Sequence, residues 1–139
     1  LGGEVGLAEQ GELGFPPVEL QANAQDHPLI SLLPERSYWL QWHEAEVKQV
    51  PPSLQVLASS THSPVQIMTG PDRVFSLQFH AEGIPSQIER WTAATEAGDS
   101  MRKDHGHDEV ARVRREADQH LPQAMESATR LFRRWLMNQ

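Results

Sequence analysis

Cysteine is absent from this sequence of 139 residues. The absence excludes disulfide bonds, thiolate zinc sites and any thiol nucleophile supplied by the chain itself. No apolar run approaches the ~20 residues that a membrane-spanning helix needs, and no basic segment followed by an apolar run resembles a signal peptide. We therefore expect a protein of a reducing compartment, most simply the cytoplasm, with no membrane partner.

Basic residues are also scarce, because 12 Lys and Arg stand against 19 Asp and Glu and give a net charge of −7 with neutral histidine. A nucleic-acid surface needs clustered Lys and Arg to displace counterions from phosphates, so nucleic acid is not an expected partner. The length fits one domain, and the modest apolar content predicts one core under a generous polar surface.

The chain divides into a strand-rich part over residues 1–84 and a helical part over residues 85–139, which we expect to form a single domain fragment. It opens on "LGGEVG" without a methionine, which is typical of the middle of a longer polypeptide. Short apolar runs between turn residues predict strands at residues 4–7, 18–21, 37–43, 54–60, 63–70 and 73–80, with a helical turn at 28–34.

Two pairings are predicted among these strands. The last two flank a Gly-Pro-Asp turn and should form an antiparallel hairpin. The strands that end at Ser60 and His80 should be neighbours in the sheet.

The helical part carries start signals and apolar stripes. Ser86 and Glu89 match a capping box, and a second helix should begin near Asp108. Pro122 should kink that helix or begin a new one, since proline lacks the amide that a helix interior uses. The apolar residues that should pack against the rest of the chain are Val110, Val113, Ala117, Leu121, Met125, Ala128, Leu131, Phe132, Trp135 and Leu136.

The stretch "VFSLQFHAE", residues 74–82, ends an apolar strand on His80 and places Glu82 two residues later. A carboxylate that accepts the Nδ1 proton of histidine holds the imidazole in one tautomer for proton transfer. Glu82 can reach His80 if the backbone turns after the strand. From spacing alone, a solvated loop at a strand end is the simpler interpretation.

Several segments in one order change that interpretation. They are "LGGEVG", "GELGFPPVEL", "HPLISLLP", "WHEAEV", "VPPSLQVLASS", "PVQIM" and "VFSLQFHAE". The series resembles the C-terminal portion of the class I glutamine amidotransferase family, in particular its stand-alone, GMP-synthase-like members. The resemblance covers residues 1 to about 90 and is most specific in the last segment.

The resemblance implies an α/β fold, the C-terminal part of a doubly wound, flavodoxin-like domain with a mixed sheet and C-terminal helices. It implies hydrolysis of a glutamine side-chain amide by a Cys-His-Glu triad, with His80 as general acid and base and Glu82 as its orienting carboxylate. It makes Trp42 and His43 candidate substrate-binding residues. Glutamine or a γ-glutamyl compound is the implied substrate, and no cofactor is implied.

The chain departs from the family pattern at three places. The nucleophile elbow would lie before Leu1, so the missing N-terminal half of the domain is an expected partner and the chain alone is expected to be inactive. Ala81 stands where the family usually has proline, and Ala45 stands where it usually has aspartate. A non-catalytic binding or regulatory module of the same fold is therefore the alternative.

Other residues allow weaker interpretations. "HGHD", residues 105–108, is a candidate metal site, although a polar loop that ends in an aspartate helix cap is simpler, and no metal ligand is assigned. By the resemblance, Glu12 and Gly14 lie near the active-site face; a turn followed by a strand is the alternative. The four tryptophans are most simply packing residues.

Overall fold

The computed structural model describes residues 1–139 except 72, 94–98, 100–102, 104–105 and 138–139. Its strands are β1 (Glu4–Gly14), β2 (Pro17–Leu20), β3 (Arg36–Tyr38), β4 (Gln41–Gln49), β5 (Gln55–Ser59), β6 (Ile67–Thr69) and β7 (Phe75–Leu77). The described helical elements are the short 3₁₀ turns η1 (Ala22–Ala24) and η2 (Ile30–Leu32) and the α-helices α1 (Pro85–Thr92) and α3 (His107–Met137).

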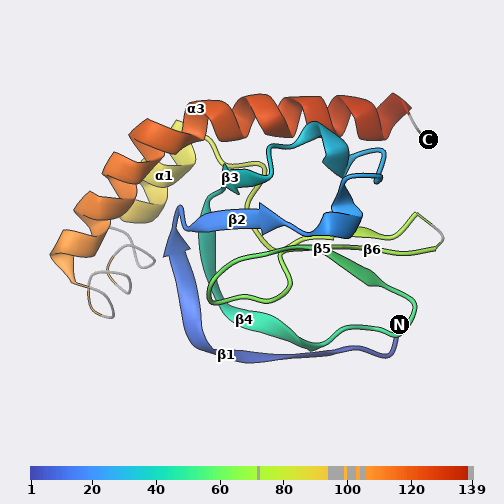
Figure 1. Ribbon diagram of the computed structural model, residues 1–139. Coiled ribbons are helices and arrows are strands. Elements are labelled where there is room, and N and C mark those ends of the chain that lie inside the picture. The colour runs from blue at the N-terminus through green and yellow to red at the C-terminus, as the bar shows by residue number, and fades with distance from the viewer. Residues whose placement is uncertain (72, 94–98, 100–102, 104–105, 138–139) are drawn as a thin grey trace.

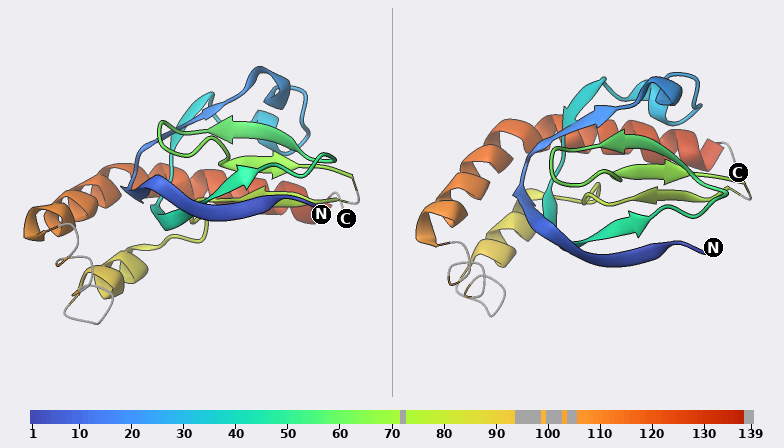
Figure 2. Two further views of the ribbon diagram at one scale, coloured as in Figure 1. Left: turned by 90° about the horizontal axis from the view of Figure 1, so that it is seen from below. Right: turned by 60° about the horizontal axis from the view of Figure 1, so that its bottom comes forward.

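The strands form two sheets. A five-stranded sheet has the order β3-β2-β5-β6-β7, and a separate two-stranded ribbon pairs β1 with β4. Every ladder between the described strands is antiparallel. Figure 2 shows the ribbon curving alongside the larger sheet. In Figure 1, α3 and the ribbon lie on opposite sides of β2. The predicted α/β character is confirmed.

Strand order confirms one predicted pairing and corrects the other. The hairpin of β6 and β7 has the expected antiparallel register, with Met68 opposite Ser76. The strands ending near Ser60 and His80 are not neighbours, because β6 lies between β5 and β7. The short turn pairs β7 with β6, and the two edges of β5 are already paired with β2 and β6. No edge of β5 is therefore open to β7.

The segment predicted as one strand over residues 37–43 is two strands in different sheets. β3 ends at Tyr38 and β4 begins at Gln41, with Trp39 and Leu40 fully buried between them. The Trp39 ring stacks on Phe79 at a centroid distance of 4.5 Å. The chain leaves one sheet and enters the other at these two buried residues.

The N-terminal part of α3 covers the core with the predicted stripe. Val110, Val113, Ala117 and Leu121 are all buried. Pro122 lies inside the continuous helix, so it does not begin a new one. Figure 1 shows the orange start of α3 at an angle to its red end, as expected where a proline removes a backbone hydrogen bond.

The C-terminal part of α3 is only partly covered. Ala124, Ala128 and Leu131 pack in the main core, in a cluster with Trp39, Leu57, Ile67 and Phe79. Four residues that the apolar stripe also predicted to be packed are exposed, namely Met125, Phe132, Trp135 and Leu136. No helix in the described ranges has both the length and the apolarity for a membrane crossing.

The start of α1 differs from the predicted capping box. The residue that caps this helix is Ile84, Pro85 occupies the first turn, and no side chain caps the helix. Proline suits this place because its fixed φ is helical and its missing amide would lack a helical partner anyway. Ser86 therefore already lies inside the helix and cannot act as the cap.

Gly14 ends β1 where α3 crosses it. Its φ of +91° lies in the left-handed region, and a Cβ at this position would lie 2.5 Å from Glu116 Oε2. The same carboxylate oxygen accepts the Phe15 amide at 3.0 Å. Arg112 adds a second contact, donating to the Leu13 carbonyl at 3.0 Å and to Glu116 at 2.6 Å. We call these contacts of Arg112 and Glu116 with residues 13–15 the clasp. Glycine is required at position 14 because a side chain there would displace the Glu116 carboxylate.

We predict that Gly14→Ala lowers the free energy of unfolding of the full-length protein by about 1–3 kcal/mol, from left-handed strain and the lost Glu116 contact. Denaturant unfolding measures the change. Gly6→Ala is the matched control, since its Cβ would meet only the flexible Lys48 side chain at 3.3 Å. Equal losses in the two variants would contradict the clasp.

Candidate active site

His80 and Glu82 are in contact, as their spacing predicted. His80 Nδ1 lies 2.7 Å from Glu82 Oε1. The imidazole is 30% exposed and the carboxylate 61% exposed, so the pair faces solvent at the end of the sheet. A carboxylate in this position favours the tautomer that carries its proton on Nδ1 and leaves Nε2 free for proton transfer. The geometric prediction is confirmed, and the catalytic role stays a prediction.

The backbone creates this contact by turning directly after His80, which forms an isolated antiparallel bridge with Leu40 beyond the end of β7. The His80 amide donates to the Leu40 carbonyl at 2.8 Å, and the Gly83 amide donates back to the His80 carbonyl at 3.2 Å. Ala81, where the resemblance leads one to expect proline, is buried within the turn. The turn therefore holds the His80 and Glu82 side chains on one side without the fixed φ of proline.

Trp91 lies against the other side of the candidate general base. Its ring meets the His80 ring edge-on at 5.1 Å and the Trp42 ring edge-on at 5.0 Å. Thus α1 supplies a tryptophan that connects the His80 pair with β4. Sequence reasoning treated Trp91 only as a packing residue, because nothing in local spacing tells which residue a helix brings to a strand end.

Trp42 and His43, the two candidate substrate-binding residues, point to opposite sides of β4. Trp42 packs with Leu13, Val110 and Val113 as well as with Trp91. His43 turns inward, and its Nδ1 lies 2.9 Å from the Ala45 carbonyl. The structure therefore places Trp42 beside Trp91, whose ring also contacts His80. The His43 side chain instead enters a separate buried polar group.

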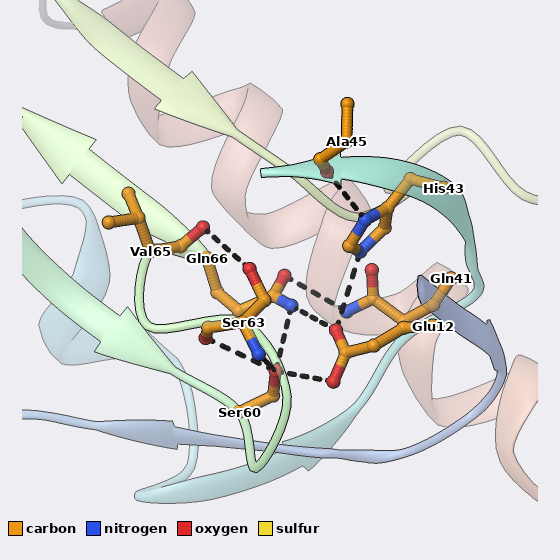
Figure 3. Close-up of polar contacts among 8 residues, drawn as sticks. All are labelled: Glu12, Gln41, His43, Ala45, Ser60, Ser63, Val65 and Gln66. Carbon is orange, nitrogen blue, oxygen red and sulfur yellow. Dashed lines mark hydrogen bonds and ion pairs between the residues drawn. The ribbon is translucent and has the colours of Figure 1, made fainter. Parts of the chain in front are cut away.

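That polar group centres on Glu12 of β1, the weaker sequence candidate. Ser60 donates to Glu12 Oε1 at 2.6 Å and Gln66 donates to Oε2 at 2.6 Å. His43 Nε2 lies 3.3 Å from Oε2, an ion-pair distance without hydrogen-bond alignment. Figure 3 shows these side chains converging from β1, from β4 and from the loop between β5 and β6. We call Glu12, Gln41, His43, Ser60 and Gln66 the Glu12 cluster.

The Glu12 carboxylate is ionised within this cluster. Burial alone would raise its pKa, but the His43 imidazole, the Ser60 hydroxyl and the His62 backbone amide together hold the pKa below its ordinary value. A lowered folded-state pKa means that Glu12 contributes stability above the ordinary carboxyl pKa. This contribution is lost as the pH falls through the lowered value.

The metal candidate "HGHD" falls largely outside the described residues, because neither His105 nor the His107 side chain is described. Within the described ranges, no group of three or more His, Asp or Glu side chains is placed to hold a metal ion.

Comparisons with known proteins point to one family. The family model described as "Glutamine amidotransferase class-I" matches residues 1–94. The chain is 41% identical over 83 residues to the glutamine-hydrolysing GMP synthase of Lactobacillus delbrueckii subsp. bulgaricus, covering 59% of this chain and 16% of that protein. It is 38% identical over 84 residues to a glutamine-hydrolysing GMP synthase polypeptide of Haloarcula marismortui, covering 59% of this chain and 43% of that polypeptide. The chain thus spans less than half the length of these relatives.

A solved structure shows the same fold. The glutamine amidotransferase of Thermotoga maritima superposes with a TM-score of 0.73 at 20% identity, covering 96% of this chain and 55% of that chain. The likeness extends through the helical residues beyond the family match, so α1 and α3 belong to the same fold as the strands.

Proposed function

Because this chain belongs to the class I glutamine amidotransferase family, we propose that His80 and Glu82 are the proton-transfer half of a Cys-His-Glu triad that hydrolyses the side-chain amide of glutamine. The observation that carries the proposal is the 2.7 Å contact between His80 Nδ1 and Glu82 Oε1 at the end of β7. The names of the relatives, which hydrolyse glutamine, supply the substrate class.

The reaction divides between this chain and a nucleophile outside it. A cysteine thiolate attacks the amide carbon, and protonated His80 gives a proton to the leaving ammonia, which leaves a glutamyl thioester. Neutral His80 then takes a proton from water as the water attacks the thioester, so that glutamate and the thiol are released. Glu82 keeps the imidazole oriented and stabilises its positive form in both steps.

Trp42 and His43 are the proposed substrate-binding residues. The Trp91 ring contacts both the Trp42 ring and the His80 ring, so one aromatic cluster connects β4 with the proposed proton-transfer pair. The main chain of this stretch would hold the head group of glutamine or of a γ-glutamyl compound. The Ala45 side chain offers no polar group here, and only its carbonyl contacts His43.

We also propose where the nucleophile comes from and which parts of this chain contact the segment that carries it. The sequence has no cysteine, so the thiol comes from another segment, proposed to be the N-terminal half of the same domain. Two features support this partner. β7 is at the end of the strand order, and Phe132, Trp135 and Leu136 are exposed on α3. Residues 1–139 are then one part of a single cytoplasmic domain.

A second candidate function is a non-catalytic binding or regulatory module of the same fold. The observations that favour it are the absent cysteine and alanine at position 45. A glutaminase assay of the full-length protein, by ammonia release, decides between the two candidates. Turnover that depends on His80 supports catalysis, and a folded protein without turnover supports the module.

We predict that Glu82→Gln lowers kcat of the full-length protein roughly ten- to a hundredfold, and less than loss of His80. The glutamine amide oxygen can still accept a hydrogen bond from Nδ1, but the negative charge that stabilises the imidazolium is lost. Because Glu82 is exposed, solvent already screens that charge in the unsubstituted protein, so the loss is limited. Steady-state ammonia release gives kcat. Glu89→Gln, an exposed acid on α1, is the matched control and should leave kcat unchanged. Wild-type kcat in Glu82→Gln would remove this residue from the triad.

A further inference from the structure

Glu12 is a buried carboxylate that the proposed proton-transfer pair does not use. Its side chain is 1% exposed. Ser60 and Gln66 each donate to it at 2.6 Å, and Gln66 also donates to the Ser60 hydroxyl at 3.0 Å. A charged group at this depth is costly unless other groups compensate it. Because several polar groups surround this carboxylate, we infer that its charge holds neighbouring segments of the fold in place.

One such segment carries His43, which lies directly opposite Glu12 in the register of β1 and β4. Both ring nitrogens of His43 face oxygen acceptors, Nδ1 the Ala45 carbonyl at 2.9 Å and Nε2 the Glu12 carboxylate at 3.3 Å. The approach of Nε2 to Glu12 is an ion-pair distance without hydrogen-bond alignment, so the carboxylate lies against the ring rather than at the end of a hydrogen bond. Glu12 therefore contacts His43 directly and, through the contact of the ring with the Ala45 carbonyl, supports residues 43–45 of β4.

Gln41, two residues earlier on β4, is held by the same cluster. Its amide donates to Gln66 Oε1 at 2.9 Å, and Gln66 in turn donates to Glu12. Strand side chains alternate, so fixing positions 41 and 43 on one face fixes the position between them on the other. That position is Trp42, whose ring packs on Trp91 at 5.0 Å.

We propose that Glu12 is a positioning residue for glutamine binding. Its carboxylate fixes β4 over residues 41–45, and so sets the place of Trp42 and of the main chain that would receive the glutamine head group. The assignment rests on the proposed glutaminase function. Glu12 reaches the His80 pair only through Trp42 and Trp91, so its effect falls on substrate binding more than on proton transfer.

The test is a steady-state glutaminase assay on full-length protein. We expect Glu12→Gln to raise KM for glutamine about tenfold with kcat within about twofold, because a shifted binding wall weakens substrate binding while the proton-transfer pair stays in place. A purely structural role would lower the folded, active fraction and therefore kcat at an unchanged KM. Glu9→Gln, the same change at an exposed position of β1, is the matched control and should change neither constant.

A second variant covers the case in which Glu12→Gln does not fold. Ser60→Ala removes one donor to Glu12 but keeps the charge, and it should raise KM by a few-fold in the same direction. KM within twofold of wild type in the folded variants overturns the assignment. His80→Ala in the same assay separates the two proposals. Unchanged turnover in His80→Ala overturns the proposed triad, whereas turnover lost there with normal KM in Glu12→Gln overturns only the role of Glu12.

Discussion

Replacing His80 with alanine should reduce glutamine hydrolysis by the full-length protein at least about a thousandfold. Without the imidazole, the pair loses the group proposed to protonate the leaving ammonia and keeps only Glu82, an exposed carboxylate. The water that cleaves the thioester also loses its base. Ammonia release at saturating glutamine measures the loss.

The fold should survive this substitution. His80 is partly exposed, and its backbone hydrogen bonds to Leu40 and Gly83 do not involve the side chain. Circular dichroism and thermal unfolding check this point. His62→Ala is the matched control, because His62 is exposed and approaches Glu12 through its backbone. Unchanged turnover in His80→Ala would rule out the proposed triad.

The second large effect concerns residues 1–139 alone, which should release no ammonia from glutamine. Amide hydrolysis by this route needs a covalent acceptor for the glutamyl group, and histidine only moves protons. The chain has no cysteine to accept it. Activity should appear when the chain is joined to, or mixed with, the segment that carries the nucleophile.

Purified chain, assayed alone and after mixing with a polypeptide that carries the proposed nucleophile segment, tests this dependence. Gel filtration of the same samples adds a physical readout. The exposed side chains of Phe132, Trp135 and Leu136 should make the chain alone associate or precipitate, and the partner should relieve this. A matched mixture in which the partner's cysteine is replaced by alanine should bind but not turn over. Turnover by the chain alone, lost in His80→Ala, would mean that these residues contain another nucleophile.

Local patterns predicted the parts of the fold that depend on neighbouring residues. The hairpin of β6 and β7 follows from two apolar runs around a short turn, and the buried stripe of α3 follows from helical spacing. The contact between His80 and Glu82 is also local, since it needs only a turn directly after the strand. The family resemblance raised this pair above the simpler solvated-loop interpretation.

Contacts between distant segments were the parts that the sequence did not predict. The place of β6 between β5 and β7 depends on which edges are free, and the division of residues 37–43 between two sheets depends on what Trp39 is packed against. Trp91 reaches His80 only because α1 folds back over the strand end. Glu12 was marked by resemblance, but its partners Ser60 and Gln66 lie in the loop between β5 and β6, far from Glu12 in the sequence, so no local pattern links them.

The ribbon of β1 and β4 has an irregularity in its register between Leu7 and Glu12, which divides it into two ends of unequal rigidity. The end near Glu12 is held by buried side chains and by α3. At the far end, where Val5 pairs with Val47, no other strand in the described part of the chain adds to the ribbon, and both Val5 and Leu7 are exposed. Fraying of that far end costs little free energy and breaks no contact of Glu12 or His43. We therefore expect fraying at the tip to leave the part of β4 that carries Trp42 in place, on the other side of the register irregularity.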